Sequence, residues 1–217
     1  MKYILYSLTA ILSFSAFSCG TLIGKGEIIT EPRHIPNFNA IILESSADIY
    51  ITQGPLYLEV IGYENLVPDL TTEVKNNQLF ISSKSNSIIE NNNLEVHLAV
   101  PELVLIEIRG AGNVETVNSL NADQLTINLK GASNIHLAGT ANQINCNLQG
   151  TGDIKVCEMN ASNVQSLLNG TGNIYAYPNQ TMTATINGTG NVYYLGNPQL
   201  NQQVNGVGSI QQIVTCQ

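Results

Sequence analysis

Three titratable side chains, Glu115, His136 and Lys155, sit where a regular repeat would bring them together. Each lies five residues after the start of a glycine-containing block, so stacked strands would set them side by side. They could form a small polar site, but we favour a solvated surface of alternating charge. A glycan hydrolase needs two acids that converge on one bond, and the aspartates fall at different phases of the repeat. The sequence therefore predicts no catalytic residues.

Metal and cofactor motifs are not predicted either. Calcium-binding glycine repeats use a nine-residue period with an aspartate in each copy, whereas only Asp153 is acidic within the six glycine blocks. No Cys-x-x-Cys or Cys/His cluster points to zinc. The Gly-x-Gly pairs are not followed by a helical pattern, as a dinucleotide motif requires. We expect no metal and no cofactor.

Three tyrosines are the candidate ligand contacts. Tyr175, Tyr193 and Tyr194 follow two successive blocks, and aromatic rings on a repeat surface can bind glycan rings or a protein partner. Tyrosine is also common on exposed strands because it suits a pleated surface. Both interpretations remain open from the sequence.

The glycine blocks themselves recur through the second half of the chain. Their first glycines lie 18 to 21 residues apart, and a fixed period near twenty indicates a stacked repeat. Glycine permits a positive φ or a bend that a Cβ would obstruct, while Asn and Asp bond to nearby backbone and can bond between stacked coils. The predicted turn residues are Gly110, Gly112, Asn113, Gly131, Asn134, Gly150, Gly152, Asp153, Gly170, Gly172, Asn173, Gly188, Gly190, Asn191, Gly206 and Gly208.

Apolar residues alternate with polar ones on both sides of each block, which is the period of a half-buried strand. A unit of twenty residues cannot bury such a face alone, but stacked units can. The sequence predicts an all-β fold, a right-handed parallel β-helix (β-solenoid) with coils of about 18–21 residues. Small residues at the second block position predict an inward corner. The N-terminal half is expected to be less regular, with Ser45 to Ile49 a degenerate first copy and a hairpin at Lys75–Asn77.

This pattern resembles the putative auto-transporter adhesin, head GIN domain family. The resemblance rests on the six blocks and on Ala47-Asp48-Ile49, and it covers about residues 37–213. It implies a right-handed β-helix at the cell envelope of Bacteroidetes-like bacteria, with an adhesive role.

The N-terminus predicts export. One lysine, Lys2, precedes an apolar run from Ile4 to Phe17 that is too short for an ordinary transmembrane helix. Ala16-Phe17-Ser18-Cys19 resembles a bacterial lipobox, so we predict a signal peptide over residues 1–18 and a lipidated Cys19. Ordinary secretion is the alternative. Residues 19–36 are expected to be a tether, and residues 37–217 one domain.

Three further cysteines, Cys146, Cys157 and Cys216, specify no disulfide framework because one must remain unpaired. Buried thiols are the favoured interpretation, and a Cys146–Cys157 disulfide is the alternative.

The amino-acid composition disfavours some classes of function. The net charge of −8 and the scattered Lys and Arg residues disfavour nucleic acid. We expect a non-catalytic protein, exported and lipid-anchored to the outer membrane, that acts as an adhesin or binding module for a glycan or a host or cell-surface protein. The sequence leaves open whether it faces the cell surface or the periplasm. A structural or self-associating envelope component, possible as a homo-oligomer, is the alternative, and a glycan-degrading enzyme is the least favoured.

Overall fold

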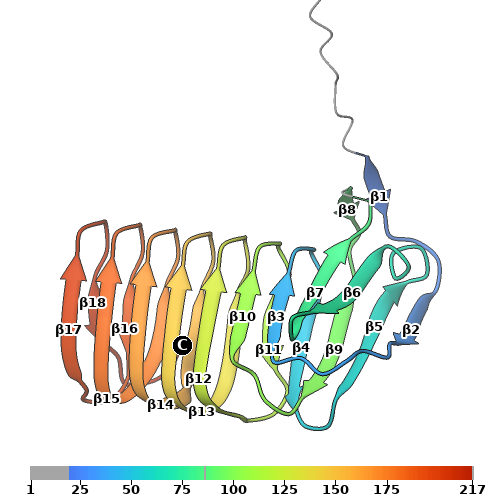
Figure 1. The fold of residues 1–217 in the computed structure, drawn as a ribbon. Helices are drawn as coiled ribbons and strands as arrows, with labels where there is room; N and C mark the ends of the chain where they lie inside the picture. Colours follow the sequence, from blue (N-terminus) through green and yellow to red (C-terminus); the bar gives the residue numbers. More distant parts are fainter. Residues whose placement is uncertain (1–19, 86, 217) are drawn as a thin grey trace, which may run out of the picture.

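The computed structural model describes residues 20–85 and 87–216, so the predicted signal peptide and Cys19 lie outside the described residues. Every regular element in this part is a strand (Figure 1). No helix there is long and apolar enough to cross a membrane. The N-terminal half contains β1 (Thr21–Ile23), β2 (Ile28–Pro32), β3 (Ala40–Leu43), β4 (Asp48–Gln53), β5 (Tyr57–Tyr63), β6 (Leu70–Lys75), β7 (Gln78–Ser83), β8 (Ile88–Glu90) and β9 (Glu95–Val100). The repeat half contains β10 (Leu105–Ile108), β11 (Val114–Thr116), β12 (Leu120–Leu129), β13 (Ile135–Leu148), β14 (Ile154–Leu168), β15 (Ile174–Ile186), β16 (Val192–Tyr194), β17 (Gln199–Val204) and β18 (Ile210–Gln212).

The repeat half is a β-solenoid with two main walls, as predicted. We call the strands that run into each glycine corner wall A, and those that leave it wall B. Wall A contains β10, β12, the C-terminal halves of β13, β14 and β15, and then β17. Wall B contains β11, the N-terminal ends of β13, β14 and β15, and then β16 and β18. All these pairs are parallel, so each coil repeats the path of the one before it.

The core lies between the walls. Side chains alternate across each strand, and the inward columns on both walls are apolar. Stacking places each column in one buried ridge, which is how units too small to fold alone share a core. The fully buried members next to the corner are Ile108, Leu129, Leu148, Leu168 and Ile186 on wall A, and Val114, Ile135, Ile154, Ile174 and Val192 on wall B.

The glycine corners require glycine for two different reasons. At the third block position Gly190 has a φ of +143°, and a Cβ there would lie 1.7 Å from the carbonyl oxygen of Gly172 in the preceding coil. At the first position the left-handed region is not needed. A Cβ on Gly110 would instead lie 1.8 Å from the carbonyl oxygen of Ser45. Close stacking of successive corners, as much as backbone conformation, therefore explains these residues.

Residues at the second block position are exposed, so the prediction of an inward corner is wrong. The corner turns the side chain at this position away from the core, while its backbone forms a parallel bridge to the next coil. The bridged residues are Ala132, Thr151, Thr171, Thr189 and Val207.

The fourth block position forms a ladder along the corners. The side-chain oxygen of each residue accepts a hydrogen bond from the backbone N–H of its counterpart in the next coil. The first rung joins Asn113 N to Asp48 Oδ1 at 2.8 Å, and the last joins Ser209 N to Asn191 Oδ1 at 3.0 Å. The predicted bonding between coils is confirmed, with backbone amides as the principal donors. The intervening members are Asn134, Asp153 and Asn173.

The N-terminal half departs from sequential stacking. Ser45 to Ile49 is a corner of the solenoid, as predicted, because Ala111 N donates to Ser45 O at 3.0 Å. The next coil outward comes from later in the chain, however. Strands β7 and β9 pair with β3 and β4 respectively on the side away from β10 and β11. The chain therefore runs outward from the first coil and then returns to start the repeats.

Antiparallel strands close this N-terminal end. On wall A, β6 pairs with β7 through the predicted hairpin, whose Asn76 and Asn77 have φ values of 51° and 61°. On wall B, β5 pairs with β9, and β2 pairs with β5. Residues expected to be a tether thus form β1 and β2. The backbone of β2 finds partners on β5, and Arg33 then donates to Leu70 O at 2.8 Å and to Val67 O at 2.9 Å.

The cysteines pair in a way that the sequence did not predict. Cys157 forms a disulfide with Cys216, and their Cα atoms lie 5.7 Å apart. Cys146 is a buried free thiol, and burial raises its pKa to about 12. The prediction of buried thiols is therefore correct for Cys146 and wrong for Cys157 and Cys216, and the Cys146–Cys157 alternative is wrong.

Candidate functional site

Wall B carries a continuous outward row five residues after the start of each block. Strand register places Glu115 beside His136, His136 beside Lys155, and Lys155 beside Tyr175. The predicted stacking of this column is therefore confirmed. The His136 Nε2 atom also lies 3.4 Å from Oε1 of Glu158, which is outside this column. The row ends in Tyr193 and Gln211.

Tyr175 and Tyr193 stack within this row. Their ring centroids are 4.9 Å apart with an interplanar angle of 23°, and Lys155 Nζ lies 5.5 Å from the centroid of Tyr175. Only 8% of Tyr175 is exposed, and burial, together with the nearby charge of Asp153, raises its pKa. Because stacked rings cover each other's faces, this pair offers ring edges and hydroxyl groups more readily than a flat aromatic platform.

Tyr194 does not belong to the tyrosine row. It lies one residue further along β16, and alternation turns its side chain toward the core, where it packs partly buried. The expectation of three tyrosines on one contact surface is wrong for this residue. A second stacked pair at the other end of the wall, Tyr50 and His97 with centroids 4.6 Å apart, was not predicted.

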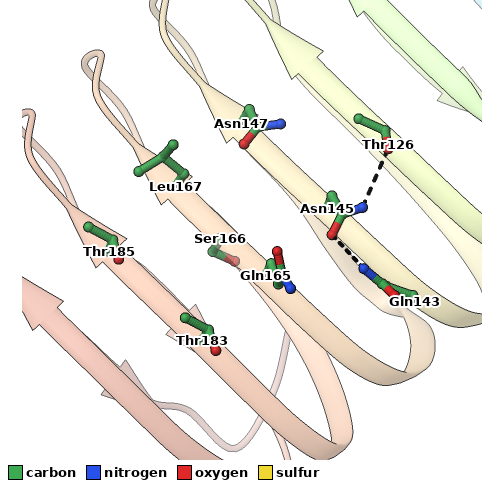
Figure 2. Close-up of a pocket in the computed structure, with 9 residues that line it drawn as sticks. All are labelled: Thr126, Gln143, Asn145, Asn147, Gln165, Ser166, Leu167, Thr183 and Thr185. Atoms are coloured by element: carbon green, nitrogen blue, oxygen red, sulfur yellow. Dashed lines mark hydrogen bonds between the residues drawn. The ribbon is translucent and has the colours of Figure 1, made fainter.

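Wall A holds a polar groove that the sequence analysis missed. It crosses β12, β13, β14 and β15 and has a volume of about 420 Å³ (Figure 2). Its lining consists of amides and hydroxyls with one outward leucine and no charged group. The lining residues are Thr126, Gln143, Asn145, Asn147, Gln165, Ser166, Leu167, Thr183 and Thr185.

The two sides of this groove differ in hydrogen bonding. On the β12–β13 side, Gln143 Nε2 donates to Asn145 Oδ1 at 3.0 Å, and Asn145 Nδ2 reaches Thr126 Oγ1 at 3.5 Å (Figure 2). On the β14–β15 side, none of Gln165, Thr183 and Thr185 has a side-chain hydrogen bond to another described residue. Their donors and acceptors face solvent, so this side can bind a polar ligand without first breaking internal bonds.

A charged cluster borders the groove wall at β10. The Glu107 side chain is only 8% exposed and receives Arg109 Nε at 2.6 Å and Lys130 Nζ at 2.9 Å. Burial alone would raise the Glu107 pKa, but the hydrogen bonds from Lys130 and Arg109 outweigh it and hold the pKa below its ordinary value. Each carboxylate oxygen is occupied, so the cluster stabilises adjacent coils rather than presenting an acid for catalysis.

Charged side chains are confined to the first part of the solenoid. Glu158 is the last Asp, Glu, Lys, Arg or His residue of the sequence. The column directly before the corner shows the same change, from Arg109 and Lys130 to Asn169 and Asn187. Within the residues that the structure describes, no group of three or more His, Cys, Asp or Glu side chains could hold a metal ion.

Comparison with known proteins agrees with this architecture. The family model described as putative auto-transporter adhesin, head GIN domain, matches residues 37–198, and the chain belongs to this family. A putative adhesin from Bacteroides fragilis NCTC 9343 has a similar crystal structure, with 25% identity, a TM-score of 0.73 and coverage of 88% of this chain and 100% of the other. A putative adhesin from Parabacteroides merdae ATCC 43184 shares the fold at 19% identity, with a TM-score of 0.54 and coverage of 89% and 99%. No curated protein matches the chain.

Proposed function

We propose that this protein is a non-catalytic adhesin, exported and attached to the outer membrane through a lipid on Cys19. Family membership supports an adhesive role at the cell surface or envelope. The lipobox-like Ala16-Phe17-Ser18-Cys19 supports the anchor. The outward row of wall B supports binding rather than catalysis, because Glu115 is the one carboxylate among its members in the repeat half, and glycoside hydrolysis needs a pair.

The ligand is a neutral glycan, and the groove on wall A binds it. The observation that carries this choice is the set of unpaired polar groups on Gln165, Thr183 and Thr185. Adjacent strands repeat about every 4.8 Å, so these groups form a regular array that an extended, hydroxyl-rich chain can follow. An uncharged lining disfavours anionic ligands, and Leu167 offers an apolar contact for a sugar ring. The stacked tyrosines of wall B are the second surface to test.

Glycan binding by the purified protein tests this proposal. The double variant Gln165→Ala/Thr183→Ala is expected to weaken binding of neutral oligosaccharides at least tenfold, whereas Tyr193→Ala on wall B serves as the matched control. Loss of binding in Tyr193→Ala alone would move the site to wall B. Failure of the unaltered protein to bind any neutral glycan would contradict the proposed ligand.

Protease treatment of intact cells tests the location. We expect digestion of the repeat domain on intact cells and release of a Cys19→Ala variant from the membrane. Protection until the outer membrane is opened would contradict direct adhesion.

A self-associating envelope component is the second candidate function. The observation that favours it is the C-terminal end of the solenoid, where β17 and β18 pair on one side only among the described residues.

A further inference from the structure

The last coil leaves a sheet edge and part of the core uncovered. Val204 continues the wall A column that buries Leu168 and Ile186, yet it is 45% exposed. Val207 at the corner is 71% exposed, and Val214 in the tail is 94% exposed. Val204 lies in β17, at the end of wall A in Figure 1, and Val207 follows it at the last corner. No described coil covers Val204 in the way that its counterparts Leu168 and Ile186 are covered, whereas the corner position of Val207 is exposed in all six glycine blocks.

This edge has none of the features that normally prevent strands from pairing between molecules. Proteins protect exposed edges with charged residues, proline, bulges or covering segments. Strand β17, with the sequence Gln-Leu-Asn-Gln-Gln-Val, contains no charge and no proline, and its pairing with β15 is regular over all six residues. Its inner side carries Leu200, Gln202 and Val204, so an unpaired backbone edge lies beside two apolar side chains that are not fully buried. Such an edge favours pairing with another strand.

A second copy of this chain fits the edge. The protein carries a net charge of −8, but no Asp, Glu, Lys, Arg or His follows Glu158. Two copies can therefore approach through their C-terminal coils without the like-charge repulsion that other surfaces would produce. A strongly charged partner, by contrast, could form no ion pair with the side chains of β17 or β18.

We propose that two copies associate end to end, with β17 of one pairing antiparallel with β17 of the other across a twofold axis. Such an interface uses the same surface on both subunits and closes as a dimer. Six residues face six, and Val204 and Val207 become buried between the copies. Head-to-tail growth into a filament is opposed because the other end of the solenoid carries Pro32 on β2 and a Glu73–Lys75 ion pair on β6.

The dimer places the two membrane anchors far apart. Gly20 and β1 lie at the end of the solenoid opposite to β17 and β18 (Figure 1). If Cys19 carries the lipid, as the proposed function holds, an end-to-end dimer directs its anchors in opposite directions. This arrangement joins two facing membranes, so the C-terminal end acts as a homophilic adhesion surface.

Sedimentation equilibrium of residues 19–217, which contain every described coil, tests the interface without any glycan. The unaltered protein is expected to form a dimer with a concentration-dependent mass. Gln202→Lys adds a charge to the exposed inner side of β17 and should produce a monomer. Thr185→Lys, on the outward side one coil earlier, is the matched control and should remain dimeric. A monomer at all concentrations for the unaltered protein, a dimeric Gln202→Lys, or open-ended polymers would each overturn the proposal.

Vesicle clustering tests the orientation separately. Cys19 can be coupled to maleimide lipids selectively, because Cys146 is buried and Cys157 and Cys216 are joined. Phosphatidylcholine vesicles that carry the protein should cluster, and those that carry Gln202→Lys should not. Clustering that Gln202→Lys retains, or its absence in a protein that dimerises in solution, would overturn the bridging arrangement. Neither result depends on glycan binding, so the two proposals fail independently.

Discussion

The two ends of the solenoid solve the same problem differently. Parallel stacking always leaves an unpaired strand at each end. At the N-terminal end the chain turns back on itself, and antiparallel strands β6, β5 and β2 complete the walls. Charged residues and Pro32 then occupy the outermost strands. At the C-terminal end the described residues add no antiparallel strand to β17 and β18, which carry no charged residue. The N-terminal edge strands thus carry the charged residues and the proline that usually prevent pairing between molecules, and β17 and β18 carry neither.

The strongest test of the comparison concerns the glycine corner, which is regular only in the repeat half. Gly190→Ala is expected to destabilise the protein by about 4 kcal/mol or more, because the Cβ meets the Gly172 carbonyl at a φ of +143°. Urea unfolding measures this change. Gly54→Ala in the N-terminal half, where no atom lies within 4 Å of the added Cβ, is the control and should change stability little. Equal effects of the two substitutions would contradict the stacking explanation.

The disulfide links the C-terminal tail covalently to β14 and so stabilises the uncharged coils. Cys216→Ser is expected to lower the free energy of unfolding by about 3 kcal/mol, because Cys157 and Cys216 are 59 residues apart and their link restricts the unfolded chain. Limited proteolysis should then cut first in the coils after Cys157. Cys146→Ala is the control, since it removes a thiol without opening a covalent loop. Unchanged resistance of these coils in Cys216→Ser would show that stacking alone holds them.

The stability of the part of the solenoid that carries charged residues, up to Glu158, should depend on pH. Glu107 has a lowered pKa, so its contribution is present above its ordinary pKa of 4.5 and is lost as the pH falls toward the folded value. Glu107→Gln should lower the free energy of unfolding by about 2 kcal/mol at pH 7. Below pH 4.5 the variant should lose less further stability than the unaltered protein. Urea midpoints from pH 7 to pH 3 measure both effects. Exposed Glu115→Gln should leave the profile unchanged, and an equally acid-sensitive Glu107→Gln protein would refute this role.

The smallest expected loss of stability concerns the corner ladder, which runs through both the charged coils and the uncharged coils after Glu158. Asn191→Ala removes the acceptor for Ser209 N, and Asn113→Ala removes the acceptor for Asn134 N. Asn113→Ala should cost about 1 kcal/mol, the usual contribution of one such hydrogen bond. Asn191→Ala should cost more, because the Asn191 side chain also accepts from Ser209 Oγ at 2.8 Å and donates to Asn173 Oδ1 at 3.3 Å. Thermal unfolding compares the two, and equal losses would contradict a contribution from these additional bonds.

The repeat half could be predicted because its information is local and recurs. Alternation identified the inward columns, and glycine spacing identified the corners. The groove on wall A could have been found from the same alignment, because its amides and hydroxyls occupy the polar columns between the apolar ones. The tyrosine row was correctly aligned for Tyr175 and Tyr193. The prediction is wrong for Tyr194 because adjacent residues of a strand face opposite sides, so Tyr193 and Tyr194 cannot share the outward row.

The N-terminal half could not be predicted to the same degree. The insertion of β7 and β9 beyond β3 and β4 depends on a return of the chain that no repeat marks. The strands β1 and β2 lack their own apolar alternation and form because partners on β8 and β5 are available. The disulfide depends on a tail that folds back to Cys157, and spacing alone does not encode that path.

The sequence by itself determined the period, the corner chemistry and the all-β class, because a twenty-residue unit with two apolar faces can bury them only by stacking. Only the tertiary structure decided the order of the coils, the Cys157–Cys216 link and the difference between the two ends. These features depend on which strands meet across long sequence separations. Such pairings are set by the free energy of the whole assembled stack rather than by the preferences of any one segment.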